Sequence, residues 1–174
     1  MCIWRPCDTV ETAVAWRDAL ERTHGPTSLV LTRQKVPHQD RNDEQIKNIV
    51  KGGYVLKDSE STPDLILIAT GSEVSLALKV AENMTDKQIM VVSLPCWELF
   101  DEQQESYREK ILGKNSLRVS IEAASPFGWE KYVGRNGIII SMNSFGESAP
   151  AEDLYKHFGI TAERIVQKIK RKIR

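Results

Sequence analysis

The most restrictive feature of this sequence is the apolar segment DLILIATG, which runs from Asp64 to Gly71. A strand that is apolar at successive positions must be covered on both faces, as happens in parallel sheets flanked by helices. The segment SEVSLALKVAENM follows directly, and its apolar spacing predicts an amphipathic helix. This part of the chain is therefore expected to fold as a strand–helix unit of an α/β domain.

The same alternation continues to the end of the chain. GYVLKD predicts an edge strand, and further strands are predicted at QIMVVSLP, LRVSIEAA and NGIIISMNSFG. Helices are predicted at DEQQESYREKIL, around Gly128 to Val133, near Ala149 to His157 and at Ala162 to Lys172. Strands that alternate with helices form mostly parallel sheets with right-handed crossovers. The expected fold class is α/β, with a mostly parallel sheet and helices on both faces.

The first 37 residues have a less complete pattern. A helix is predicted over 8–22, because Asp8 and Glu11 have capping-box spacing and an apolar stripe follows them. A short buried strand is predicted over 28–32, between Gly-Pro and Val-Pro turns. No strand is expected before the helix, so the segment is interpreted as a helix–strand remnant of a second α/β domain.

A polar segment, VPHQDRNDEQIKNIVKG, separates this remnant from the regular part of the chain and ends at Gly52-Gly53. The change of composition marks a domain boundary, with a linker that holds one helical turn or more. The expected division is 1–37, a linker at 38–52, and a second domain at 53–174.

Charge and cysteine content indicate which partners and which kinds of site are not expected for this chain. The 24 basic and 24 acidic side chains cancel, so neither a nucleic acid nor a membrane surface is an expected partner. Cys2, Cys7 and Cys96 form no CxxC pair, and the histidines have no metal-ligand spacing, so the sequence predicts neither a disulfide framework nor a metal site. A cytoplasmic location is expected for such a chain.

Arg33 is the first candidate binding residue. It closely follows the predicted strand, and ligands of open α/β sheets bind at the carboxyl edge. The alternative is an arginine that extends into solvent or pairs with a nearby carboxylate. Position alone favours the alternative.

Two other strand ends carry polar groups. In ATGSE, Thr70 and Glu73 have capping-box spacing, and free N–H groups there could hold an anion, but a single glycine is no nucleotide motif. A structural cap is favoured. Glu122 could serve as a base or as a hydrogen-bond anchor; with no histidine or second motif carboxylate nearby, a structural role such as capping the Ala-Ala-Ser turn is favoured.

Two further expectations are structural. Ser148 is expected to cap the helix that begins near Ala149. Phe127, Trp129 and Tyr132 are expected to fill a domain or subunit interface, where aromatic residues are enriched. No nucleophile, base and oxyanion hole are brought together by the motifs.

Several stretches together resemble one family, in order and spacing, from about Trp4 to the C-terminus. They are WRPCDTVETAVAW, GPTSLVLTRQ, GGYVLKD, LILIATGSEVSLAL, VVSLPCWELFDEQ, YREKIL and FGESAPAEDLYKHFGIT, and they are similar to the final quarter of transketolase. Transketolase is a homodimer that depends on thiamine diphosphate and magnesium or calcium. It moves two-carbon ketol units between sugar phosphates such as xylulose 5-phosphate and ribose 5-phosphate in the pentose phosphate pathway.

The resemblance implies a role for each part of the chain. Residues 1–37 would end the pyrimidine-binding domain, and 53–174 would form the C-terminal domain, with a five-stranded sheet that has one antiparallel strand. Arg33 matches the family's arginine that binds the substrate phosphate, which reverses the preference drawn from position. A guanidinium suits this role because it is permanently charged and forked.

The family's coenzyme-binding loop, activating glutamate and substrate-binding histidines match no part of this chain. The resemblance therefore implies no catalytic, cofactor-binding or metal-binding residue here, and a chain that begins partway through the pyrimidine-binding domain. Alone, the chain is expected to be inactive and to bind no coenzyme. The alternatives are a subunit completed by a separate N-terminal chain, and a non-catalytic module for dimerisation or regulation.

Overall fold

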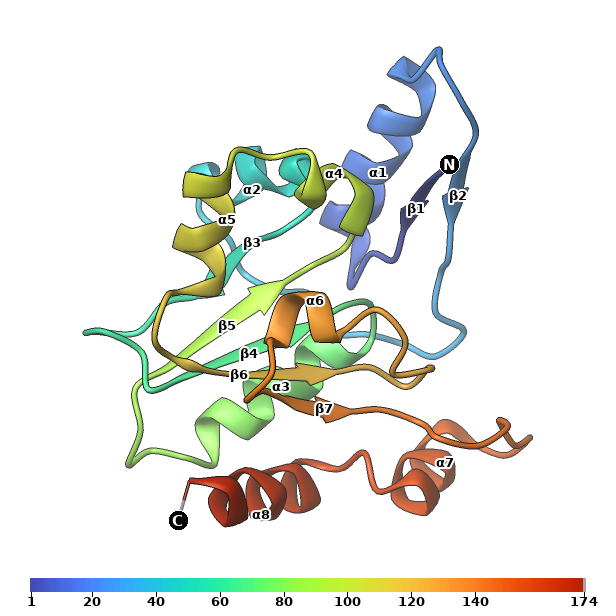
Figure 1. The fold of residues 1–174 in the computed structure, drawn as a ribbon. Coiled ribbons are helices and arrows are strands. Elements are labelled where there is room, and N and C mark those ends of the chain that lie inside the picture. Colours follow the sequence, from blue (N-terminus) through green and yellow to red (C-terminus); the bar gives the residue numbers. More distant parts are fainter. Residues whose placement is uncertain (174) are drawn as a thin grey trace.

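The computed structural model describes residues 1–173 and contains two sheets of unequal size (Figure 1). The larger sheet has the order β3-β5-β4-β6-β7. Only β3 runs antiparallel to its neighbour, and the other pairs are parallel. Its strands are β3 (Tyr54–Lys57), β4 (Leu65–Ala69), β5 (Ile89–Ser93), β6 (Leu117–Ile121) and β7 (Ile138–Ile140). The predicted α/β fold with a mostly parallel five-stranded sheet is confirmed.

Helices cover both faces of this sheet (Figure 1). One face carries α3 (Glu73–Glu82), α7 (Ala151–Phe158) and α8 (Ala162–Lys172), and the other carries α4 (Trp97–Asp101), α5 (Glu105–Leu112) and α6 (Glu130–Val133). The apolar β4 serves both layers: Leu65 and Leu67 join the core under α3 and α8, whereas Ile66 and Ile68 join the core that contains Phe100. Successive side chains of a strand point to opposite faces, so an uninterrupted apolar run fits a sheet covered twice.

The smaller sheet shows that one expectation was wrong. A strand, β1 (Cys2–Trp4), precedes α1 (Thr9–Glu21) and pairs in parallel with β2 (Thr27–Leu29). The N-terminal segment is therefore a strand–helix–strand unit rather than a helix followed by a strand. Three residues are too few to show a strand period, which explains why the sequence pattern hid β1.

The second predicted strand is shorter and less buried than expected. β2 ends at Leu29, and Val30 and Leu31 are 51% and 53% exposed. β2 has a partner on one side only, so the described chain offers no layer to cover the residues that follow it. The prediction of a buried strand over 28–32 was wrong in its extent and in its burial.

The linker segment is folded and holds α2 (Asp43–Asn48) and the 3₁₀ turn η1 (Ile49–Lys51). Arg41, just ahead of α2, is buried and donates to the Asp8 carboxylate over 2.6 Å and to the Tyr54 hydroxyl over 2.7 Å. It is thereby bonded to the amino end of α1 and to β3 at the same time.

Glu11 completes this buried polar network. Its carboxylate accepts hydrogen bonds from the hydroxyls of Tyr54 at 2.7 Å and Ser93 at 2.6 Å, and from the backbone N–H of Cys7 at 2.7 Å. Asp8 also caps α1 by accepting from the backbone N–H of Glu11, as predicted. We call Asp8, Glu11, Arg41, Tyr54 and Ser93 the junction network. It fastens the N-terminal unit to the larger sheet.

The expectations for Ser148 and for the aromatic group need correction. α7 begins at Ala151 with Pro150 at the cap position, and no side chain caps it. Trp129 and Tyr132 lie in the core of the same domain, at 0% and 2% exposure, rather than at an interface. None of the helices in residues 1–173 has the length and apolar character that a membrane crossing requires.

Candidate functional site

A cleft of about 880 Å³ opens between the two sheets, at the carboxyl ends of β4, β5 and β6. The turns that follow these strands form one wall, and Ile3, Arg5 and the residues after β2 form the other. Ligands of open α/β sheets bind at this edge, so the cleft is the candidate functional site.

Arg5 joins the two walls. Its backbone N–H donates to the carbonyl of Pro95 over 2.8 Å, and its carbonyl accepts the N–H of Gly71 at 3.0 Å. The guanidinium forms an ion pair with Glu122 and lies 4.7 Å from the ring centre of Trp97. Its charge is therefore already balanced by the protein.

Glu122 is held in place by its neighbours and is not free to act as a base. Besides Arg5, the indole N–H of Trp129 donates to its carboxylate over 2.5 Å. Burial raises the pKa of Glu122, and the charge of Arg5 and the indole hydrogen bond oppose this rise. The favoured structural role is supported by these contacts, but the partners are Arg5 and Trp129 rather than the Ala-Ala-Ser turn.

The Thr70–Glu73 corner is not the predicted capping box. The hydroxyl of Thr70 donates to the carbonyl of Arg5 over 3.2 Å, and α3 begins only at Glu73, with no side-chain cap. Glu73 instead accepts hydrogen bonds from Ser72, over 2.8 Å, and from the hydroxyl of Tyr155 on α7. The Thr70 hydroxyl therefore links the two sheets, a role that its spacing from Glu73 in the sequence does not reveal.

Arg33 lies four residues beyond β2, on the exposed segment that borders the cleft. Its neighbours Thr32 and Gln34 line the cleft, and Gln34 donates to the hydroxyl of Tyr155 over 3.4 Å. Within residues 1–173 the guanidinium of Arg33 has no hydrogen-bond or ion-pair partner. In contrast to Arg5, it is a cation available to an anionic ligand.

The rim of the cleft is apolar where it is most exposed. Val30 and Leu31 are more than half exposed, and Phe127, in the turn after β6, is 88% exposed. We call Val30, Leu31 and Phe127 the rim patch. Within the described residues the cleft lining includes exposed apolar surface and lacks a nucleophile next to a free base. Arg33 is not part of the lining itself but lies between two residues that are, Thr32 and Gln34.

Sequence reasoning singled out Arg33 and Glu122 and missed Arg5 and Glu98, which also line the cleft. Arg5 directly follows the three-residue β1, and Glu98 lies within the short helix α4. Both lie in stretches that resemble the family, but neither belongs to a pattern that indicates a binding or catalytic role. A charged residue next to a short apolar stretch was the only available signal for Arg5.

A family model described as "Transketolase-like TK C-terminal domain" matches residues 52–161. The curated protein "Transketolase 1" of Vibrio vulnificus is 51% identical over 173 residues, which is 98% of this chain and 26% of that protein. The chain thus spans about a quarter of the length of the curated relatives it matches.

Solved structures give the same match. A Pichia stipitis transketolase, in complex with sedoheptulose 7-phosphate, has a TM-score of 0.90 and 36% identity, and the alignment covers 99% of this chain and 25% of that one. A split-gene transketolase, described as an inactive β4 tetramer, shares the fold with a TM-score of 0.77 at 20% identity, over 99% of this chain and 56% of that one.

Proposed function

This chain belongs to the transketolase family and corresponds to its C-terminal part, and on that premise we propose that it serves the transfer of two-carbon ketol units between sugar phosphates. Its proposed contribution is substrate binding, through the cation at the rim of the cleft. The observation that carries the proposal is that Arg33 is exposed and unpartnered within the described chain, while Arg5 and Arg41 are both ion-paired.

Arg33 is the proposed ligand of the sugar phosphate. A guanidinium forms two parallel hydrogen bonds to phosphate oxygens, and its charge does not depend on pH in the physiological range. Binding the distal phosphate also positions the reacting carbons at the far end of the sugar. Substrate orientation is thus the step to which this chain's own residues contribute.

The proposed domain division follows the family. Residues 1–37 belong to the pyrimidine-binding domain, 38–52 form the linker, and 53–174 form the C-terminal domain. The two sheets and the folded linker are in keeping with this division. The junction network then fastens one domain to the next.

The residues of the cleft do not fit thiamine diphosphate with its divalent ion. A diphosphate with its divalent ion needs several free N–H groups or cations, whereas Arg33 is a single arginine beside the cleft. The carboxylates Glu73, Glu98 and Glu122 line the cleft, and the charge of Arg5 is taken up by Glu122. We therefore assign coenzyme binding to other parts of the complete enzyme, and no step through the coenzyme is derived from this chain.

A chimera tests the proposal. This chain would replace the matching 173 residues of the Vibrio vulnificus relative, and transfer from xylulose 5-phosphate to ribose 5-phosphate would be measured. We expect activity within about tenfold of the parent enzyme, because the sequences are 51% identical. A chimera that folds and binds coenzyme but transfers no ketol unit would contradict the proposal.

The rim patch favours a second candidate, a subunit completed by a separate N-terminal transketolase chain. Exposed apolar residues around a functional cleft are typical of a protein interface. Mixing this chain with the complementary N-terminal portion of the relative would then restore activity without a covalent link. Activity only in the fused chimera would contradict this candidate and leave the first one standing.

A further inference from the structure

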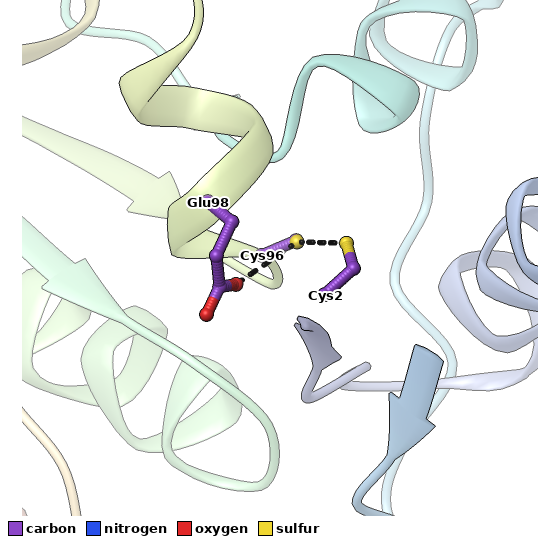
Figure 2. Close-up of side chains that lie close together, drawn as sticks. All are labelled: Cys2, Cys96 and Glu98. Atoms are coloured by element: carbon purple, nitrogen blue, oxygen red, sulfur yellow. Dashed lines mark hydrogen bonds between the residues drawn. The ribbon is translucent and has the colours of Figure 1, made fainter. Parts of the chain in front are cut away.

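Two cysteines that lie 94 residues apart in the sequence meet between the two sheets. Cys2 belongs to β1, and Cys96 immediately precedes α4. Their sulfur atoms are 3.3 Å apart, and both residues are completely buried. Figure 2 shows the side chain of Glu98 turned toward the same point from the first turn of α4.

The three side chains offer a compact ligand set. The Sγ of Cys96 lies 3.5 Å from Oε2 of Glu98, and the two sulfurs and the carboxylate oxygen all lie within 4.8 Å of one another. Two thiolates and a carboxylate are ligands that Zn²⁺ accepts in tetrahedral sites. We propose that Cys2, Cys96 and Glu98 form a three-ligand site for Zn²⁺ that links the N-terminal unit to the larger sheet.

The geometry needs only a small adjustment. With Zn–S bonds of about 2.3 Å and tetrahedral angles, the two sulfurs would be about 3.8 Å apart, so they must separate by about 0.5 Å. A disulfide would require the same sulfurs to approach to about 2.05 Å, a larger shift, and it would give Glu98 no role. The observed arrangement is therefore closer to a metal site than to a disulfide.

A neighbouring backbone group orients the carboxylate ligand. The N–H of Ile3, next to Cys2 on β1, donates to Oε2 of Glu98 over 3.2 Å. Such outer hydrogen bonds fix ligand orientation in metal sites. Zn²⁺ is bound by thiolates, so its binding would release the two thiol protons to solvent.

The ion has a path to the site. Ile3 and Glu98 line the cleft, and Glu98 is half-buried, so the carboxylate joins the buried sulfurs to the solvent-filled side. Three protein ligands leave the fourth position of a tetrahedral ion for water from the cleft. This inference concerns residues other than Arg33 and holds or fails independently of the proposed sugar-phosphate binding.

Titration with Co²⁺ as a spectroscopic substitute for Zn²⁺ tests the site. The chain would be kept reduced with a phosphine, and we expect thiolate-to-cobalt charge-transfer absorption that saturates at one equivalent and disappears when Zn²⁺ is added. Cys2→Ser and Cys96→Ser should abolish the absorption. Glu98→Gln should weaken the affinity by at least the roughly 10- to 100-fold that the loss of an outer hydrogen-bond partner costs. Zn²⁺ should also raise the unfolding temperature of the unmodified chain.

Cys7→Ser is the matched control, because Cys7 is equally buried but its sulfur accepts from Arg41 instead. This variant should keep the full absorption. If the serine variants fail to fold, which circular dichroism would show, Glu98→Gln decides, because its side chain is half-buried. Absence of the charge-transfer band in the reduced chain, an equal loss in Cys7→Ser, or a Glu98→Gln variant that binds as well as the original would overturn the proposal.

Discussion

Two parts of the N-terminal unit, the start of α1 and the segment after β2, have very different surroundings. At the start of α1, Asp8 and Glu11 are buried and bonded to Arg41, Tyr54 and Ser93. Past β2, Val30, Leu31 and Arg33 are exposed. The side chain of Arg41 is 1% exposed and forms an ion pair with Asp8, whereas Arg33 is exposed and has no partner within the described residues.

This difference distinguishes an arginine that stabilises the fold from one that can bind a ligand. A guanidinium surrounded by carboxylates stabilises the fold, and it has no spare charge for a ligand. A guanidinium left free at the rim of a cleft adds little to stability but can bind an anion. Arg41 therefore has the first role, and Arg33 is proposed to have the second.

The largest expected effect is on stability. Arg41→Met should lower the free energy of unfolding by about 3–5 kcal/mol, because it leaves Asp8 and Glu11 as buried charges without their counter-ion. Arg33→Met, the matched control, should change it by less than about 0.5 kcal/mol. Urea denaturation with an unchanged m-value would measure both. Similar losses of unfolding free energy in the two variants would show that Arg41 and Arg33 do not differ in their contribution to stability.

The junction network should also respond to acid. Burial alone would raise the pKa of Asp8, but hydrogen bonds from Arg41 and from the N–H groups of Gln39 and Glu11 outweigh burial and lower it. A carboxyl whose pKa is lowered by folding stabilises the fold above its unfolded pKa of about 3.9, and this contribution is lost as the pH falls through the folded value.

The variant Asp8→Asn removes this titration. In the acid range, below about pH 5, its unfolding free energy should fall less steeply with pH, by up to one proton per molecule. Parallel urea titrations between neutral and acidic pH would compare the slopes. Asp86→Asn, an exposed residue outside the helices, is the control for the loss of one carboxylate. Identical slopes for Asp8→Asn and the unmodified chain would show that Asp8 is not held ionised by the network.

The smallest effect is expected at the rim patch. Leu31→Ser should change the free energy of unfolding by about 0.5 kcal/mol or less, since its side chain is more than half exposed. Leu67→Ala, in the completely buried β4, should cost about 2–5 kcal/mol and provides the scale. Thermal unfolding of both variants would compare their losses of unfolding free energy. A Leu31 variant as unstable as the Leu67 variant would mean that the rim patch is part of the core.

Much of the larger sheet could be predicted from the sequence. The apolar run of β4 has to be buried on both faces, and the regular alternation of strands and helices that follows it leaves few other folds. Asp8 as the cap of α1 was also predictable, because a cap depends on residues three positions apart.

The contacts that join the two sheets could not be predicted in the same way. Arg41 reaches Asp8 across 33 positions, and Cys2 reaches Cys96 across 94. Periodic patterns of apolar residues do not reveal contacts between residues so far apart in the sequence. Arg41 lies in the segment that the sequence predicts as a polar linker, and the burial of its side chain depends on partners that only the folded chain brings together.

For Arg33, the sequence position alone left two interpretations open. Its position near a strand end suggested a ligand site, but the same position is common for an arginine in solvent. The resemblance to transketolase favoured the functional interpretation, and the unpartnered guanidinium beside the cleft is consistent with it.

The most direct measurement compares phosphorylated and unphosphorylated donors in the chimeric transketolase. Arg33→Leu should lower kcat/KM for xylulose 5-phosphate by about 10- to 100-fold, the value of a charge-assisted hydrogen-bonded pair, and should leave kcat/KM for free xylulose nearly unchanged. Arg17→Leu, an exposed arginine on α1, should change neither. Equal losses for the two donors, or no loss for xylulose 5-phosphate, would contradict the assignment of Arg33 to the substrate phosphate.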